Sequence, residues 1–323
     1  MSVANAAIAK EAVKKAKNKT EKPICQEDRL RNLDNRPPEM QLKLGLACAA
    51  DGKTVVCDRY MAYPLSVSPV FRLEANGSGL EPELERRAYL YRMNTSPGLL
   101  AGDKLGMAVN LAAGCELYLT DQAATKVHTM PVLGSQAVVM YDITVEEAAT
   151  LEFLPEPLIL FADAQLKQTT TVVLHESAGL TLGEIVLPGR LARGEMYMFR
   201  EYLSRIRVAT PEGRVWFIDA MKLLGQENCF AESALFATYP VLGTLLLVLP
   251  AAVATTENLN RLNGRIDSLS VDGLELACST LPGDRGLFVR AISATTRDMQ
   301  AAFKTAAGFV RSIRNQPSLP YSL

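Results

Sequence analysis

The stretch VNLAAGCELYL at residues 109–119 recurs as ITVEEAATLEF at residues 143–153 and as VVLHESAGLTL at residues 172–182. Each copy has apolar residues at alternate positions on two arms, with a small turn between the arms. Alternate side chains of a strand lie on one face of a sheet, so this period of two predicts a pair of short strands in each copy. The copies begin about 34 and about 29 residues apart, which is typical of stacked units that bury one continuous core. The repeat favours a layered β solenoid or sandwich, although turns fall at similar intervals in any all-β protein.

The composition is that of an ordinary globular protein, since 48% of the 323 residues are hydrophobic and 21% are charged. This length allows one long domain or two short ones. The formal net charge of -1 argues against broad attraction to phosphate backbones, so nucleic acid is not an expected partner. No apolar core of the secretory kind occurs near the N-terminus, and the cytoplasm is the expected compartment.

The six cysteines stand at positions 25, 48, 57, 115, 229 and 278, without CxxC or any other spacing typical of metal ligands. No short secreted framework surrounds them. Buried thiols are the expectation, and a bound soft metal is the alternative.

The ends of the chain differ in composition from its middle. Residues 1–38 include a lysine-rich run and end in Asn35-Arg36-Pro37-Pro38. With few apolar residues, this segment is predicted to be a disordered or weakly helical basic tail, with a contact for an acidic partner as the alternative. A single β-rich domain is predicted at residues 39–316, followed by a C-terminal tail at residues 317–323.

Further strands follow from local patterns. Leu42, Leu44 and Leu46 alternate before Asp51-Gly52, a pair that favours a tight turn, and together they predict a hairpin. The segment from Asn76 to Arg87 reads as a polar loop. Other strands are predicted at residues 88–93, 202–208, 215–218 and 286–295.

The run from Leu235 to Ala254 is nearly all apolar and is long enough to suggest a membrane span. Pro240 and Gly243 interrupt it, however, and residues 244–250 have the length of a buried strand, so no membrane is expected as a partner.

Two helices are predicted near the C-terminus. Residues 255–266 show a helical pattern, with Thr256 as a possible cap, and residues 299–313 have apolar side chains at the spacing of an amphipathic helix.

Polar loops carry the candidate functional residues. His128 is one of only two histidines and is a candidate for metal binding or proton transfer, although a single histidine at a strand end is more often simply hydrogen-bonded. Glu152 and Glu156 suggest a glycosidase-like pair, with exposed positions on alternating strands as the other interpretation. Arg190 and Glu195 fit either protein recognition or an internal ion pair.

Recognised catalytic motifs are missing from the sequence: it has no Gly-x-Ser-x-Gly, no His-Glu-x-x-His and no Gly-x-Gly-x-x-Gly. A Ser-His-Asp set is assembled in space and leaves no such trace, but nothing points to one. The residues therefore favour a scaffold over an enzyme.

Four motifs, in this order, resemble the urease accessory protein D family, called H in some organisms. They are Asn94 to Asp103, Leu119 to His128, Leu151 to Phe161 with Ala164 and Gln168, and Gly189 to Glu195. The resemblance spans about Leu42 to Ile313 and leaves out the lysine-rich tail.

The resemblance implies a mainly β, β-helix-like solenoid of short strands with a few helices, one of them near the C-terminus. It also implies a non-enzymatic scaffold that binds accessory protein F, through it the GTPase G, and apo-urease. Nickel would pass through the scaffold toward the urease site without being tightly bound, and His128 is the candidate for transient metal contact. A β-rich hydrolase that uses loop carboxylates is the alternative. The residues expected at the passage or at partner surfaces are Asn94, Ser96, Asp103, Gln122, Lys126, His128, Glu152, Glu156, Asp163, Gln168, Arg190, Arg193 and Glu195.

Overall fold

The repeat seen in the sequence is reproduced by the strand register of the computed structural model, which describes residues 39–72, 86–227, 229–316 and 319. On the first arm, Val109 lies opposite Ile143, which lies opposite Val172. On the second arm, Leu117, Leu151 and Leu180 align in the same way. Both ladders are parallel, so the three copies stack side by side.

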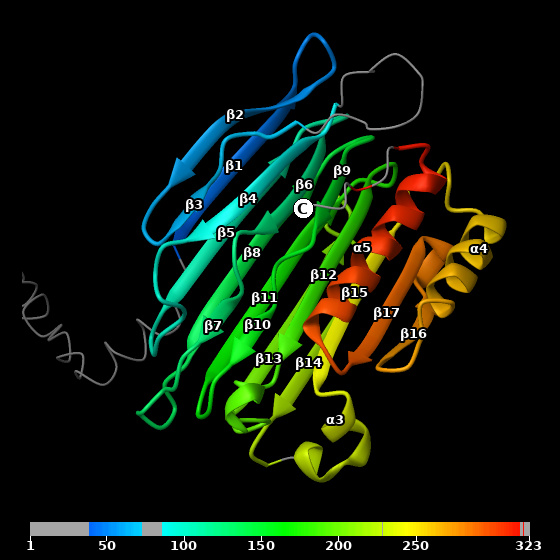
Figure 1. Cartoon of the computed structure of the whole chain (residues 1–323). Helices are drawn as coiled ribbons and strands as arrows, with labels where there is room; N and C mark the ends of the chain where they lie inside the picture. The colour runs from blue at the N-terminus through cyan, green and yellow to red at the C-terminus, as the bar shows by residue number, and fades with distance from the viewer. Residues whose placement is uncertain (1–38, 73–85, 228, 317–318, 320–323) are drawn as a thin grey trace, which may run out of the picture. The chain divides into compact units, whose positions relative to one another are not determined.

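The two arms of one copy do not pair with each other, which corrects the prediction of paired strands within a copy. The first arms belong to one sheet and the second arms to another, and the turn between them crosses from sheet to sheet (Figure 1). The reason is that apolar side chains on both arms point into the same core, which a two-layer arrangement allows and a flat hairpin does not.

Two sheets result, with seven and ten strands. The seven-stranded sheet contains, in spatial order, β14 (Val215–Leu224), β13 (Glu201–Ala209), β11 (Gln165–Leu174), β8 (Ala137–Val145), β5 (Lys104–Leu111), β1 (Met40–Cys48) and β2 (Thr54–Met61). The main path of the ten-stranded sheet contains β16 (Leu274–Thr280), β17 (Gly286–Ser293), β15 (Val241–Val248), β12 (Gly179–Leu187), β9 (Thr150–Phe153), β6 (Glu116–Asp121), β4 (Ala88–Asn94) and β3 (Leu65–Val67). Two short strands, β7 (Thr125–Val127) and β10 (Leu158–Leu160), pair with each other, and β10 also pairs with β12.

Helices cover the ten-stranded sheet on its outer face. The covering helices are α4 (Thr256–Asp267) and α5 (Thr296–Ile313). The other helical elements of the described residues are short: α3 (Ala234–Thr238), η1 (Leu191–Arg193), η2 (Cys229–Glu232) and η3 (Pro282–Asp284). Leu262 and Phe303 of these helices pack on Leu245 and Val289 of the sheet. A separate apolar cluster fills the space between the two sheets. The central strands β12 and β15 of the ten-stranded sheet are therefore buried on both faces, whereas the edge strand β16 has exposed residues.

Most predicted elements are confirmed. The turn of the first hairpin lies at Asp51-Gly52, where Gly52 has a φ of 79°. The apolar run overlaps α3 and contains the largely buried strand β15. Within the described residues no helix is long and apolar enough to cross a membrane. Thr255 caps α4 by accepting a hydrogen bond from the Asn258 amide, which corrects the proposed cap at Thr256.

Some predictions fall outside the described residues: the tails at 1–38 and 317–323, apart from residue 319, and most of the loop before Arg87. The expectation of buried thiols holds for Cys115 but is wrong for Cys48 and Cys57, which are exposed. Both lie in the edge hairpin of the seven-stranded sheet.

Candidate functional site

The side chains that face inward change from apolar to polar toward one end of the sheets. Alternation along three strands of the ten-stranded sheet places a charged residue two positions after a core leucine. These pairs are Leu90 with Arg92, Leu119 with Asp121, and Leu182 with Glu184. The facing strands of the other sheet contribute Tyr141, Gln168, Thr170 and Ser204. The period of two that builds the core thus also builds a buried polar compartment.

Arg92 and Asp121 form a bidentate ion pair within this compartment. The Arg92 Nε donates to Asp121 Oδ1 at 2.7 Å and its Nη2 donates to Oδ2 at 2.9 Å. The guanidinium also lies 5.0 Å from the ring centroid of Tyr141 and 5.4 Å from that of Phe153. Both charged groups are almost fully buried. The guanidinium of Arg92 cannot lose its proton, so it balances the negative charge of the Asp121 carboxylate.

Glu184 is a buried carboxyl whose hydrogen-bond partners are neutral. Its Oε2 accepts a hydrogen bond from Gln168 Nε2 at 2.5 Å and another from Ser204 Oγ at 3.1 Å. Burial raises the pKa of Glu184 above its ordinary value, because a charge is poorly solvated there. A cation that reached this carboxyl would offset that cost.

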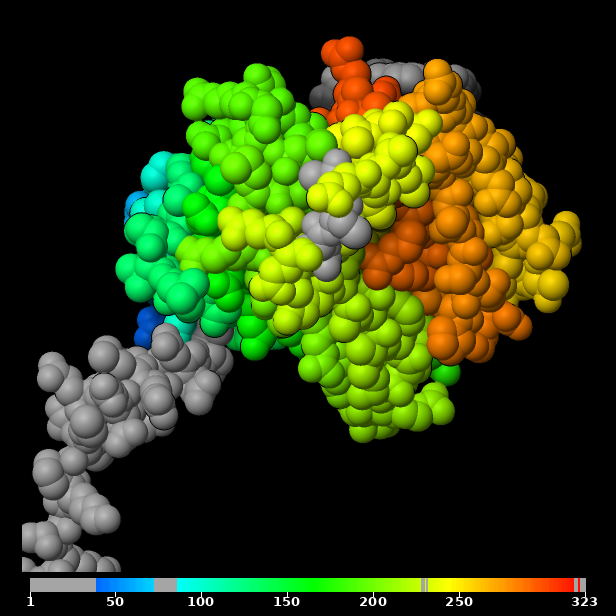
Figure 2. Space-filling view, turned by 90° about the horizontal axis from the view of Figure 1, so that it is seen from below, coloured from blue at the N-terminus to red at the C-terminus, as the bar shows by residue number. Residues whose placement is uncertain are grey.

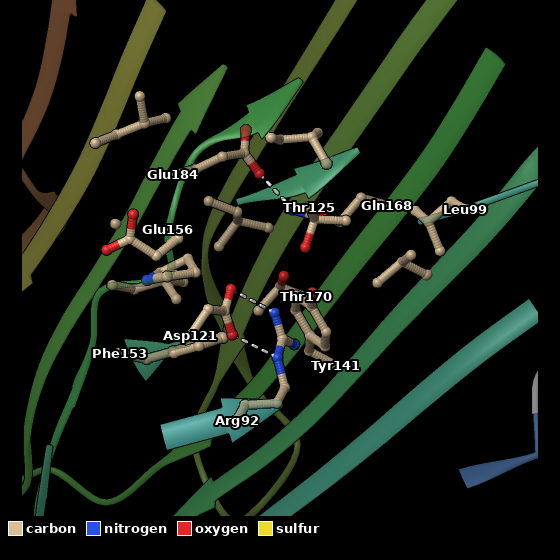
Figure 3. A pocket seen from close by; sticks show the side chains of 17 residues that line it. Arg92, Leu99, Asp121, Thr125, Tyr141, Phe153, Glu156, Gln168, Thr170 and Glu184 are labelled. Carbon is tan, nitrogen blue, oxygen red and sulfur yellow. Dashed lines mark hydrogen bonds and ion pairs between the residues drawn. The ribbon is translucent and has the colours of Figure 1, made fainter. Parts of the chain in front are cut away.

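A cavity of about 40 Å³ separates these groups (Figure 3). Glu156 and Thr125 complete its polar lining. A second cavity of about 30 Å³ shares Arg92, Asp121 and Tyr141 with the first and reaches Asn94. Each cavity exceeds the roughly 10–15 Å³ needed for one water molecule. Glu156 also accepts a hydrogen bond from Gln300 of α5 at 2.8 Å and lines a third cavity against that helix.

The four sequence motifs stack at the same end of the sheets, which Figure 2 views from below with α3 in yellow. Leu99 of the first motif forms a parallel bridge with Val127 of the second. β7 pairs with β10 of the third motif, and β10 pairs with the end of β12, which leads into the fourth. The motifs, which are far apart in sequence, thus form one ladder beside the cavities.

Phe161 joins three of these motifs. The ring of His128 meets it edge-on at 5.1 Å, and the guanidinium of Arg190 lies 4.3 Å from its centroid. His128 Nε2 is also 3.1 Å from the carbonyl oxygen of Pro97. Arg190 donates two hydrogen bonds to Glu195, each of 2.7 Å, and these bonds lower the pKa of Glu195 to about 2.

Other predicted residues shape the loops. Asn94 Oδ1 accepts hydrogen bonds from the amide and the hydroxyl of Ser96, and Asp103 Oδ2 accepts one from the Leu100 amide. Asp163 has a φ of 59° and accepts a hydrogen bond from Gln226. The side chains of Gln122, Lys126 and Arg193 are exposed.

Glu152 lies on the opposite face of its strand from the cavity, because its neighbours Leu151 and Phe153 point inward. Its carboxylate forms ion pairs with Arg87 at 2.8 Å, with Arg314 at 3.1 Å and with Arg311. Burial opposes ionisation, but the adjacent arginines lower the pKa of Glu152 to about 2. This predicted residue therefore attaches α5 to the sheet.

The structure brings Asn94, Glu156 and Gln168 of the predicted set to the cavities and leaves the others in the loops or on the outer face. Sequence reasoning missed Arg92, Asp121 and Glu184, which together with Glu156 form the charged lining of the first cavity. The sequence did contain a signal for these three residues. Each occupies an inward-facing position of a strand, two residues after an inward-facing leucine. Among the residues that the structure describes, no group of three or more His, Cys, Asp or Glu side chains could hold a metal ion.

The loop ladder depends on close backbone approach at Gly189, whose φ is 149°. A Cβ there would lie 2.1 Å from the Glu195 carbonyl oxygen. Gly189→Ala is expected to lower the free energy of unfolding, measured by urea denaturation, by at least about 2 kcal/mol. Gly194→Ala is the matched control, because φ is 73° there and nothing lies within 4 Å of the new atom. Equal losses for the two variants would contradict a steric origin.

The fold and site define a β-rich protein with a buried polar compartment beside a ladder of loops. The chain belongs to the UreD urease accessory protein family, whose sequence profile matches residues 39–321.

Individual relatives agree with this assignment. The chain is 44% identical to a urease accessory protein UreD of Trichodesmium erythraeum, over 87% of this chain and 97% of the relative. It is 30% identical to a UreD of Haloarcula marismortui, over 82% and 83% of the two chains. It is 31% identical to a urease accessory protein UreH of Helicobacter pylori, over 55% and 63%.

Proposed function

We propose that this chain is a non-enzymatic scaffold that helps insert nickel into apo-urease in the cytoplasm. In this role it binds accessory protein F and, through it, the GTPase G, and nickel crosses the space between its two sheets. The observation that carries the proposal is the Glu184 carboxyl, which is buried in a polar cavity and accepts hydrogen bonds from the neutral side chains of Gln168 and Ser204. The stacked parallel strands would then form the β-helix-like solenoid around the passage.

The chemistry of the cavity suits transient contact with nickel. Carboxylate and amide oxygens bind divalent ions, but a site with few ligands holds them weakly. Asp121 already has Arg92 as its counter-ion, whereas Glu184 can exchange a hydrogen bond from Gln168 for a cation. A proton competes with the ion for the same carboxylate. This competition weakens the binding of the ion, so its release remains easy.

The loop ladder is the proposed partner surface at the mouth of this passage. His128 and Arg190 are held against Phe161, so they present a preformed arrangement to a partner. Transient contact between nickel and His128 belongs to this proposal.

Reconstitution tests the proposal. Apo-urease, proteins F and G, nickel, GTP and bicarbonate are combined with and without this chain, and urease activity is measured. We expect activation to depend on the chain. Activation without it, together with failure to co-purify with F, would contradict the scaffold role, and turnover of a small substrate by the chain alone would favour the hydrolase alternative.

Deletion of residues 1–38 is expected to leave urease activation within about twofold of the full chain, because the family profile begins at residue 39. The same reconstitution measures this, with the full-length protein as the control. Loss of activation on deletion would assign the tail a binding role. The same conclusion would follow if only the full chain associated with nucleic acid or vesicles and high salt abolished that association.

A further inference from the structure

Two cysteine thiols meet at the end of the sheets opposite the loop ladder. Cys48 ends β1 in the seven-stranded sheet, and Cys115 directly precedes β6 in the ten-stranded sheet. Their Sγ atoms are 3.7 Å apart. Cys48 is exposed whereas Cys115 is completely buried, so a thiol that solvent reaches touches one that it does not.

The backbone around both cysteines is held in place by Thr54. This residue lies opposite Cys48 in the ladder between β1 and β2, and its side chain is buried. Its Oγ1 accepts a hydrogen bond of 2.8 Å from the amide of Glu116, the residue after Cys115. A disulfide has an S–S distance of about 2.0 Å, so the sulfurs, now 3.7 Å apart, need to approach by roughly 1.7 Å.

We propose that Cys48 and Cys115 form a disulfide that links the two sheets when the protein meets a peroxide. The Cys48 thiolate attacks one peroxide oxygen, the O–O bond breaks, and Cys48 becomes a sulfenic acid while one water is released. The Cys115 sulfur then attacks the Cys48 sulfur, the S–O bond breaks, and the departing hydroxide leaves as water with the Cys115 proton. The two thiols lose two electrons in total and the peroxide gains them.

The order of these steps follows from exposure. Cys48 is exposed and Cys115 is fully buried, so the peroxide reaches Cys48 first. Burial also raises the pKa of Cys115 to about 12, which makes its thiol a poor first nucleophile. The new bond would join residues that are 67 positions apart in the chain. Closing a loop of this length restricts the unfolded chain, so oxidation is expected to raise the melting temperature by roughly 5 °C or more.

Full-length protein treated with hydrogen peroxide and digested without reductant tests the proposal. We expect a cross-linked peptide containing Cys48 and Cys115, lighter by two hydrogens than the reduced pair, and a rise in melting temperature that dithiothreitol reverses. Cys48→Ser should abolish both results, whereas Cys57→Ser, which removes another exposed thiol of the same hairpin, should keep them. Conversion of Cys48 to a sulfinic acid, or its pairing with Cys57 while Cys115 stays reduced, would overturn the proposal. These readouts do not depend on urease.

Discussion

Glu152→Gln is expected to lower the free energy of unfolding by about 3–5 kcal/mol, the usual cost of removing one partner from a buried ion pair. The carboxylate is fully buried and faces Arg87, Arg311 and Arg314. Glutamine keeps the shape of the side chain but removes the negative charge, so the buried guanidinium groups repel each other without a counter-ion between them. Because two of these arginines lie in and just after α5, the helix should detach from the sheet first.

The acid dependence of stability provides a second measurement of the same interaction. The folded state holds the pKa of Glu152 at about 2, below the value of 4.5 for the free side chain. Its contribution is therefore complete above about pH 4.5 and is lost as the pH falls toward 2, and the variant should lack this part of the acid transition.

Chemical denaturation at several pH values measures both effects. Glu146→Gln is the matched control, because Glu146 is exposed in the turn before β9. It should change stability by no more than about 0.5 kcal/mol. Equal stability of the two variants at pH 7 would mean that the arginine cluster does not hold α5.

Glu184→Gln is expected to reduce the rate of urease activation by at least about tenfold in the reconstituted system. Replacing even an outer partner of a metal ligand changes affinity or activity by about 10–100-fold, and this substitution removes the carboxylate itself. Glutamine can still accept hydrogen bonds from Gln168 and Ser204, so the fold should survive. The loss should then be one of nickel transfer and not of stability.

A melting temperature within a few degrees of the wild type, together with unchanged co-purification with F, would separate transfer from folding and assembly. Glu147→Gln is the control, since it makes the same chemical change at an exposed turn position. Activation by Glu184→Gln at the wild-type rate would exclude the carboxyl from the passage and would leave the scaffold role itself intact.

The sequence predicted some parts of the site better than others. It located the four loop motifs and found Glu156 and Gln168, which do line the cavity. It grouped Glu152 with them because both glutamates flank apolar residues, but alternation puts Glu152 on the outer face of β9. The same rule, applied to Leu119 and Leu182, would have pointed to Asp121 and Glu184.

What the sequence determined by itself is the strand pattern and the stacking of the three copies, because a period of two and the burial of apolar side chains are local and repeat along the chain. Val109, Ile143 and Val172 align in the sequence as they do in the sheet. Only the tertiary structure decided which strands face each other, and hence that Glu184 meets Gln168 and that Cys48 meets Cys115. Those contacts join residues of different sheets, and the distance between sheets depends on the packing of every side chain between them, which no local pattern records.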